Sequence, residues 1–382
     1  SRSIFWKVGA VIILITIVVG GIGVFILRYI LRYIEVITGS IMRMVKTQRL
    51  ALIDMKDATN DDITYLGMAF NSLSSTVDNL IAIFRKFANQ DVVLKAYRDR
   101  IVKLEGSRYD LTVLFSDIRS FTFITETLGT EIIKLLNLHY DRAIREIVDL
   151  DGVMGAIIGD ALLAVFGVLE ESPENKSLRA VTAGYRLHEI TEELRRRMTA
   201  IKEQIERERG ALTEEEERIY RAVLLEIGVG IDGGEIFYGN IGSYVRMTNT
   251  VIGDPVNSAS RLEGLTRIYR VPVICSEYVK DDIEAEVGES GYRFVEIDTV
   301  LVKGKTEGRK IFWPVRENEI DDALSGDIAV FEKGRELYYR GEWDRAAAAF
   351  RKCGLPLAGV FRERTRERPP EGWDGIWEMT TK

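Results

Sequence analysis

The chain has 382 residues, 46% of them hydrophobic and 29% charged, with a net charge of −7. This length allows two or three structural units, and the acidic balance argues against a nucleic-acid-binding protein. Only two cysteines and two histidines are present. That number excludes a disulfide framework and a His/Cys metal site, so any metal ion must be held by carboxylates.

The chain begins with an uncharged apolar run, from Val8 to Leu27, in which Thr16 is the only polar residue. A helix of that length spans roughly 30 Å, about the thickness of a bilayer core. The run predicts a transmembrane helix within residues 1–29, with a signal-peptide core or a buried soluble helix as alternatives. More Arg and Lys residues follow the run than precede it, so the positive-inside rule places the rest of the chain in the cytoplasm.

The next part of the chain predicts two helices. Residues 33–45 have apolar residues at helical spacing, a polar connector follows at 54–62, and from 61 to 87 apolar residues recur in the steps of three and four of a coiled-coil seam. The arrangement resembles a HAMP domain, the parallel four-helix relay of bacterial receptors, over residues 30–82. The resemblance implies a bacterial inner-membrane location. The alternative is a plain coiled-coil stalk, and both interpretations imply a parallel homodimer.

A coiled-coil linker is expected at 83–105. From Tyr109 onward short β-rich runs alternate with helical segments, which predicts an α+β domain of about seven strands over 106–318. The expected strands are 110–118, a hairpin at 153–167, two strands around a Gly-Gly turn in 224–242, and the runs 248–254, 271–275, 291–302 and 308–315. The expected helices are 130–150, 176–197 and 256–269, the second of them extended by the charged segment 192–221.

The last part of the chain, 325–382, is expected to be a small helical tail. Within it, residues 328–353 resemble one helical hairpin of the tetratricopeptide type. A single repeat cannot bury its own apolar face, so the hairpin is expected to pack on the neighbouring domain or on a partner.

Two aspartates lie where buried strands end. Asp117 is near the end of the strand 110–118, and Asp160 is at the tip of the hairpin. If the two strands are neighbours, both carboxylates emerge at one end of the sheet, where Mg²⁺ or Mn²⁺ could be held by them and by substrate phosphates. A turn-capping role for each carboxylate is the alternative. Phosphate oxygens could also bind the first amides of the following helix, those of Ser120, Phe121 and Thr122.

Five motifs resemble those of the class III nucleotidyl cyclases, in the same order, over about 106–316: VLFSDIRSFT, GDALLAVFG, GVGIDGGEIFYGNIG, TVIGDPVNSASRLEG and VKGKTEGRKIFWPV. The resemblance implies the family's ferredoxin-like catalytic domain. It also implies conversion of a nucleoside triphosphate to the 3′,5′-cyclic monophosphate and pyrophosphate. Two metal ions per active site would activate the ribose 3′-hydroxyl and stabilise charge on the phosphates.

The resemblance also implies residue roles. Asn257 and Arg261, four residues apart on one helix face, match the pair that orients the ribose and meets the charge of the transition state. Lys303 matches the triphosphate-binding lysine. The positions that match the metal ligands are Asp117, Asp160 and, through its carbonyl, Ile118.

Two positions match the family's purine-reading residues. Thr250 suits an adenine amino group, whereas Ala156 replaces the Lys usual in adenylate-forming members and the Glu common in guanylate-forming members. Loss of one polar contact weakens base discrimination by about 1–3 kcal/mol. ATP is favoured over GTP as the substrate.

In this family the metal aspartates and the Asn/Arg pair facing one substrate come from different subunits, so a homodimer makes two composite sites. The membrane-side relay is expected to bias the alignment of those sites. Three alternatives are a guanylate cyclase, a catalytically silent dimerising module and a cyclic-dinucleotide synthase. The silent module is disfavoured by the retained Asp117, Asp160, Asn257 and Arg261, and the synthase by the lack of its Gly-Gly-acid-Glu-Phe turn.

Overall fold

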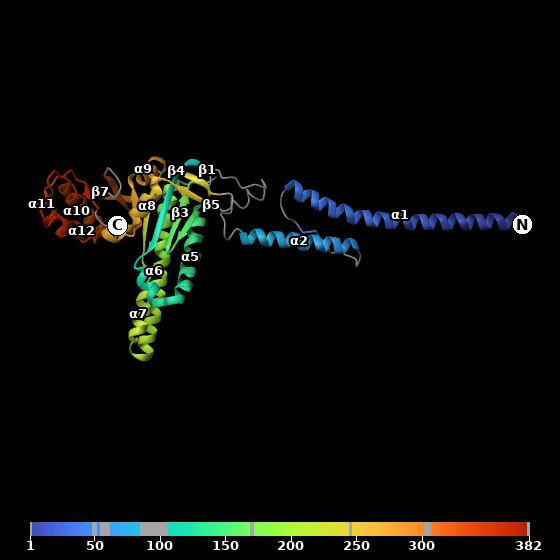
Figure 1. The fold of residues 1–382 in the computed structure, drawn as a ribbon, viewed down its shortest axis with the longest axis horizontal. Coiled ribbons are helices and arrows are strands. Elements are labelled where there is room, and N and C mark those ends of the chain that lie inside the picture. Colours follow the sequence, from blue (N-terminus) through green and yellow to red (C-terminus); the bar gives the residue numbers. More distant parts are fainter. Residues whose placement is uncertain are drawn as a thin grey trace. The chain divides into compact units, whose positions relative to one another are not determined.

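The computed structural model describes residues 2–47, 52–53, 62–84, 106–168, 172–243, 247–301 and 307–379 (Figure 1). These residues divide into two compact units, Ser1–Val102 and Lys103–Lys382, and each is described by itself. Most of the predicted connector and of the linker at 83–105 lies outside the described residues.

The first unit is helical. Its helix α1 (Arg2–Thr47) contains a segment, Trp6–Met44, that is long and apolar enough to cross a membrane, and its most apolar window has a mean hydropathy of 3.0. A second helix, α2 (Asp62–Phe84), contacts α1. The Asn71 side chain accepts a hydrogen bond from the Ile53 N–H (2.8 Å) and donates one to the Ile53 carbonyl (2.9 Å). This pair of bonds ties the chain between the helices to α2, and the HAMP assignment stays a prediction.

The second unit is built on one mixed sheet whose described part has nine strands, against about seven predicted. The strand order is β2-β3-β1-β4-β6-β8-β7-β9, and β5 pairs with β4. The strands are β1 (Gly106–Ile118), β2 (Val153–Ile158), β3 (Ala161–Phe166), β4 (Ile227–Gly242), β5 (Met247–Ile252), β6 (Val273–Ser276), β7 (Tyr292–Leu301), β8 (Arg309–Arg316) and β9 (Trp377–Glu378).

The prediction of two strands around a Gly-Gly turn within 224–242 is wrong. The single strand β4 passes through Gly233 and Gly234, because its antiparallel pairing with β1 is unbroken from Ile227 to Gly239. Gly234 has a φ of 135°, a conformation that L side chains rarely adopt, so the glycine gives the strand backbone freedom without reversing it. The partner strand also begins at Gly106, four residues before its predicted start.

Helices cover both faces of the sheet. One face carries α8 (Asp254–Tyr269), and the other carries α5 (Ile132–Asp149), α6 (Lys176–Arg209) and α9 (Glu277–Glu286), of which α9 was not predicted. Along β1, Leu114 and Ile118 belong to the core with α5, α6 and α9, whereas Leu111 and Val113 belong to the core with α8. Because side chains alternate along a strand, Asp117 lies on the α8 face.

The charged segment 192–221 is helical, but it forms a helical hairpin rather than one extended helix. The chain leaves α6 at Gly210 (φ 89°) and returns through α7 (Glu214–Val223), whose first turn is closed by a Thr213–Glu216 capping box. Figure 1 shows the last part of α6 and α7 projecting beyond the sheet. The returning helix α7 packs on α4 (Phe121–Leu128), which is followed by the short helix η1 (Gly129–Glu131).

The C-terminal tail packs on the sheet domain, as a lone hairpin requires. Its helices are α10 (Asp322–Tyr339), α11 (Trp343–Lys352) and α12 (Ala358–Arg364), preceded by η2 (Glu317–Glu319). One apolar core joins tail residues such as Phe331 and Phe361 to Tyr269 of α8 and Ile297 of β7. The strand β9 then pairs in parallel with β7, so the tail extends the sheet.

Candidate active site

The structure brings the two predicted metal ligands together. Strands β1 and β3 pair with Ser116 opposite Leu162, and this register places Asp117 beside the turn that carries Asp160. The two carboxyl groups lie close enough for Asp117 to raise the pKa of Asp160, and the backbone of Ile118 interacts with the same carboxyl group. The turn itself needs Gly159, whose φ is 66°.

The environment of Asp160 favours its protonated form. Burial, followed by the hydrogen bond and charge of Asp117, raises the pKa of Asp160 to about 6. Two carboxylates this close repel each other when both are ionised, and a divalent cation between them removes that repulsion. Among the described residues no cluster of three or more His, Cys, Asp or Glu side chains could hold a metal. A pair of carboxylates matches what Mg²⁺ takes from a protein, one or two carboxylates, with its remaining oxygens supplied by water or phosphate groups.

Tyr140 of α5, which the sequence analysis did not identify, supports the Asp160 turn. Its hydroxyl donates a hydrogen bond to the Gly159 carbonyl at 3.0 Å. Burial and the charges of Asp160 and Asp117 raise the pKa of Tyr140 to about 12, so the hydroxyl keeps its proton at neutral pH. Tyr140 thus fixes the hairpin tip from the helix on the opposite face.

A third acidic residue, Glu263, lies near the pair. It is only 9% exposed on the inner side of α8, and burial followed by the charge of Asp117 raises its pKa to about 7. A carboxylate on the apolar side of an amphipathic helix, in register with Ala259 and Leu262, is the sequence signal that could have identified it.

Arg119 connects the segment that carries the metal ligands to α8. It directly follows Ile118, and its Nη2 donates to the Thr266 hydroxyl at 3.3 Å. Its backbone N–H donates to the Glu226 carbonyl at 2.8 Å, and its Nη1 lies 3.8 Å from the Glu226 carboxylate. The end of β1 is therefore fastened to the same helix that carries Asn257 and Arg261.

The predicted transition-state pair lies on the first half of α8. Asn257 is exposed and Arg261 is half-buried, and neither side chain makes a hydrogen bond or ion pair within the described part of the chain. The beginning of the helix is held by Arg309, which contacts Asp254 at 3.0 Å and the buried Asp232 at 3.6 Å. The helix is thus fixed while its two polar side chains stay available.

The close contact between α8 and the sheet depends on glycines in β4. A Cβ at Gly230 would lie 2.1 Å from the Ala259 carbonyl oxygen and 2.2 Å from the Glu263 nitrogen. At Gly228 it would lie 2.3 Å from the side chains of Glu263 and Thr266. At Gly230 only glycine lets the helix backbone lie directly on the strand, whereas at Gly228 the added Cβ would displace side chains of the helix.

The two predicted purine-reading positions flank one apolar cluster. Ala156, next to a bulge in β2, packs against this cluster, which contains Val251, the neighbour of Thr250 in β5. Val256, the neighbour of Asn257, packs there too. Strand β2 also contacts β5, so the fold brings the two positions into one region.

Of the remaining predicted substrate-binding residues, the structure describes Phe121 and Thr122. Phe121 and Thr122 begin α4, behind Ser120, whose backbone is left-handed (φ 59°) and whose side chain does not cap the helix. Lys303 lies outside the described residues, in the gap between β7 and β8.

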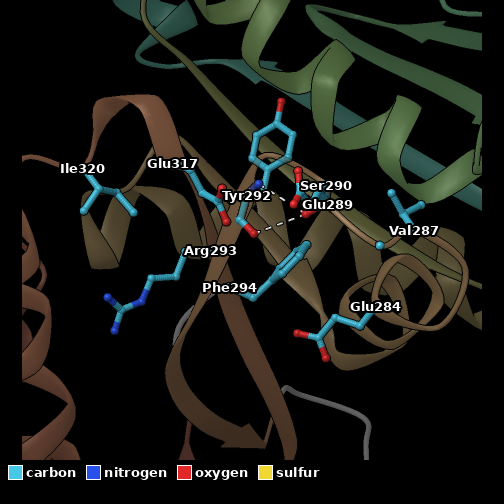
Figure 2. Close-up of a pocket in the computed structure, with 10 residues that line it drawn as sticks. Glu284, Val287, Glu289, Ser290, Tyr292, Arg293, Phe294, Glu317 and Ile320 are labelled. Atoms are coloured by element: carbon cyan, nitrogen blue, oxygen red, sulfur yellow. Dashed lines mark hydrogen bonds between the residues drawn. The ribbon is translucent and has the colours of Figure 1, made fainter.

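A separate cavity of about 460 Å³ opens between the end of α9, the start of β7 and the end of β8 (Figure 2). At its wall the Ser290 hydroxyl accepts a hydrogen bond from the Tyr292 N–H (3.2 Å) and donates one to the Tyr292 carbonyl (3.3 Å). None of the predicted site residues lines this cavity.

Sequence comparison finds relatives of this chain among adenylate cyclases. The adenylate cyclase of Anabaena cylindrica is 28% identical over 260 residues, which cover 67% of this chain and 46% of that protein. The terminal-differentiation-specific adenylate cyclase of Dictyostelium discoideum is 28% identical over 281 residues, 72% of this chain and 12% of that protein. The chain thus spans less than half the length of these two relatives.

Structure comparison shows the same fold in a bacterial light-regulated adenylyl cyclase, with a TM-score of 0.52, 20% identity and coverage of 72% of each chain. Residues 104–315, more than half of the chain, match the family model described as the adenylate and guanylate cyclase catalytic domain. The chain therefore belongs to the class III adenylate and guanylate cyclases.

Proposed function

We propose that the chain is a membrane-anchored adenylate cyclase that converts ATP to 3′,5′-cyclic AMP and pyrophosphate. The observation that carries this proposal is the Asp117–Asp160 pair, held at adjacent strand ends of a cyclase catalytic domain. Class III cyclases generally depend on divalent metals. Two Mg²⁺ or Mn²⁺ ions per site, held by these carboxylates and the Ile118 carbonyl, would supply Lewis-acid activation of the ribose 3′-hydroxyl and neutralise phosphate charge.

The chain's own residues orient the substrate. The first amides of α4, at Phe121 and Thr122, and the side chain of Lys303 bind the triphosphate. Asn257 orients the ribose, and Arg261 stabilises the negative charge that develops at the α-phosphate. Because Asn257 and Arg261 have no partner within the described part of their own chain, their side chains are available to a substrate held by a second subunit. The proposed active form is therefore a homodimer with two composite sites.

The base preference rests on two positions. Thr250 offers a hydroxyl that can accept from the adenine amino group, whereas Ala156 offers no polar group and packs in an apolar cluster. The relatives named above are adenylate cyclases, which favours ATP. Guanylate cyclase activity is the second candidate, because the residue at 156 does not select against guanine.

The test uses the full chain in detergent with ATP or GTP and Mn²⁺ or Mg²⁺, beside the variant Asp160→Asn. The matched control is Asp149→Asn, an exposed aspartate of α5 that lies outside the proposed site. We expect cyclic AMP from the parent chain and the control, and loss of product in the Asp160 variant. If neither nucleotide gives a cyclic product, the proposed enzymatic activity is refuted and the catalytically silent module remains. If only GTP gives a product, the proposal that ATP is the substrate is wrong.

Regulation through the membrane-side helices is part of the proposal. Helix α1 anchors the chain in a bacterial inner membrane with the catalytic domain in the cytoplasm, and α1 and α2 act as a HAMP-like relay that sets the alignment of the composite sites. Insertions into the segment 85–105 should change the activity because they rotate one half-site against the other. Equal activity with the relay present, deleted or shifted would contradict this role.

A further inference from the structure

The C-terminal tail contacts the end of α8 through a buried polar cluster, here called the α8 clamp, which consists of Tyr269, Asp298 and Arg364. Asp298 of β7 is fully buried. Its Oδ2 accepts hydrogen bonds from the Tyr269 hydroxyl and from Nη1 of Arg364, each at 2.5 Å. Nη2 of Arg364 donates to the Tyr269 hydroxyl at 2.9 Å, which closes a triangle of three hydrogen bonds.

The surroundings of the clamp hold the Arg364 guanidinium in one orientation. It lies 4.1 Å from the ring centroid of Trp377 and 5.2 Å from that of Phe361, and its side chain is only 6% exposed. The second oxygen of Asp298 accepts from the Thr299 N–H at 2.9 Å. Removal of one partner of a buried ion pair leaves an uncompensated charge, so the three groups of the clamp hold the tail against the end of α8.

The clamp acts on the helix of the transition-state pair. Tyr269 is the last residue of α8, about two turns after Arg261. The helix between them packs on β4 at Gly228 and Gly230. A shift of the helix end is therefore transmitted along a rigid element to Asn257 and Arg261. Arg364 comes from outside residues 104–315, which match the family's catalytic domain.

We propose that the C-terminal tail is a positioning element for catalysis: Arg364, through Asp298 and Tyr269, holds α8 so that Asn257 and Arg261 reach the site of the partner subunit. Arg364 is a positioning residue and does not touch the substrate. This inference rests on the proposed function, because it requires composite sites in a homodimer.

Mixed dimers test the inference. One subunit carries Asp160→Asn and the other carries Arg261→Ala, each with its own affinity tag. The one intact site of such a dimer takes its aspartates from the Arg261 variant and its helix α8 from the Asp160 variant. The change Arg364→Met is then placed in one subunit or the other, and kcat and KM for ATP are measured well below the unfolding temperature.

The positioning role predicts an asymmetric result. In the subunit that supplies the working α8, Arg364→Met should lower kcat by about tenfold to a hundredfold and leave KM nearly unchanged, because the lost contacts form in the transition state. In the other subunit it should leave both constants nearly unchanged. The control Arg345→Met removes an exposed ion pair with Glu342 in the same tail and should have no effect in either subunit.

A purely structural role predicts equal losses in both placements, and that result would overturn the inference, as would no loss in either. If the mixed dimer without Arg364→Met is inactive, the proposal of composite sites is wrong, and this inference fails with it. If the Arg364 variant does not fold, Tyr269→Phe carries the same test. It removes one hydroxyl and keeps the ring, and it should lower kcat about threefold with the same asymmetry.

Discussion

The contact between α8 and β4 allows a prediction whose size follows from the structure. In the variant Gly230→Ala the new Cβ would lie 2.1 Å from the Ala259 carbonyl oxygen and 2.2 Å from the Glu263 nitrogen. Both atoms belong to the helix backbone, so no side-chain rotation can relieve the clash. Ordinary contacts are about 3.4 Å or longer, and the helix must therefore move away from the sheet by about 1 Å.

Both stability and activity should respond to that movement. Overpacking of this kind costs about 1–3 kcal/mol in the free energy of unfolding, which lowers the melting temperature by about 2–10 °C. Displacement of Asn257 and Arg261 by about 1 Å should reduce kcat by up to about a hundredfold. Thermal unfolding and cyclic AMP formation by the purified full chain measure the two effects.

Gly264 is the matched control, because it lies on the same helix and a Cβ there would meet no atom within 4 Å. The variant Gly264→Ala should stabilise the protein by about 0.5–1 kcal/mol, since alanine favours a helix. Unchanged stability and activity in Gly230→Ala would refute the close contact of helix and strand.

Three further predictions concern the metal pair and the buried histidine. Mn²⁺ should raise the melting temperature more at pH 8 than at pH 5, because the Asp160 carboxyl, with a pKa of about 6, must lose its proton before it binds a cation. The variant Tyr140→Phe leaves the Gly159 carbonyl without its donor and should cost about 0.5–1.5 kcal/mol in the free energy of unfolding, together with weaker Mn²⁺ binding in a titration. Burial lowers the pKa of His139 from 6.5 to about 4, so its contribution to stability is present above pH 6.5 and is lost as the pH falls toward 4. Denaturant unfolding at a series of pH values should show a smaller acid loss in His139→Leu.

Each of these predictions has a contradicting outcome. If Mn²⁺ raises the melting temperature equally at both pH values, or still raises it in Asp160→Asn, then Asp160 is not a ligand of the metal. Mn²⁺ affinity unchanged in Tyr140→Phe would show that the hairpin tip does not need its support. The same acid loss with and without His139 would assign that loss to other groups.

Local patterns in the sequence were sufficient to predict the hairpin that carries Asp160, because its two apolar strands and its Gly-Asp turn lie within one short segment. They failed at Gly233 and Gly234, where the residues favour a turn and the structure continues the strand. Whether such a pair ends a strand depends on the neighbour that pairs with it, and β1 supplies that neighbour along the whole segment.

The same limit applies to the groups around the candidate site. Tyr140 approaches the Asp160 turn from α5, Arg119 is tied to Thr266 of α8, and Arg364 reaches Asp298 across 66 residues of sequence. None of these contacts has a periodic or motif signal, because each joins elements brought together only by the sheet order. Glu263 is the exception, since its charge on the apolar side of a helix can be recognised from spacing alone.

The sequence by itself determined the apolar N-terminal helix, the two aspartates at strand ends and the spacing of Asn257 and Arg261, because periodicity and turn chemistry act over a few residues. Only the tertiary structure decided that the two aspartates lie beside each other, that a glycine of β4 lets α8 pack directly on the strand, and that the tail contacts the end of that helix. These are contacts between residues distant in sequence, and they follow from strand register and packing, which local propensity does not encode.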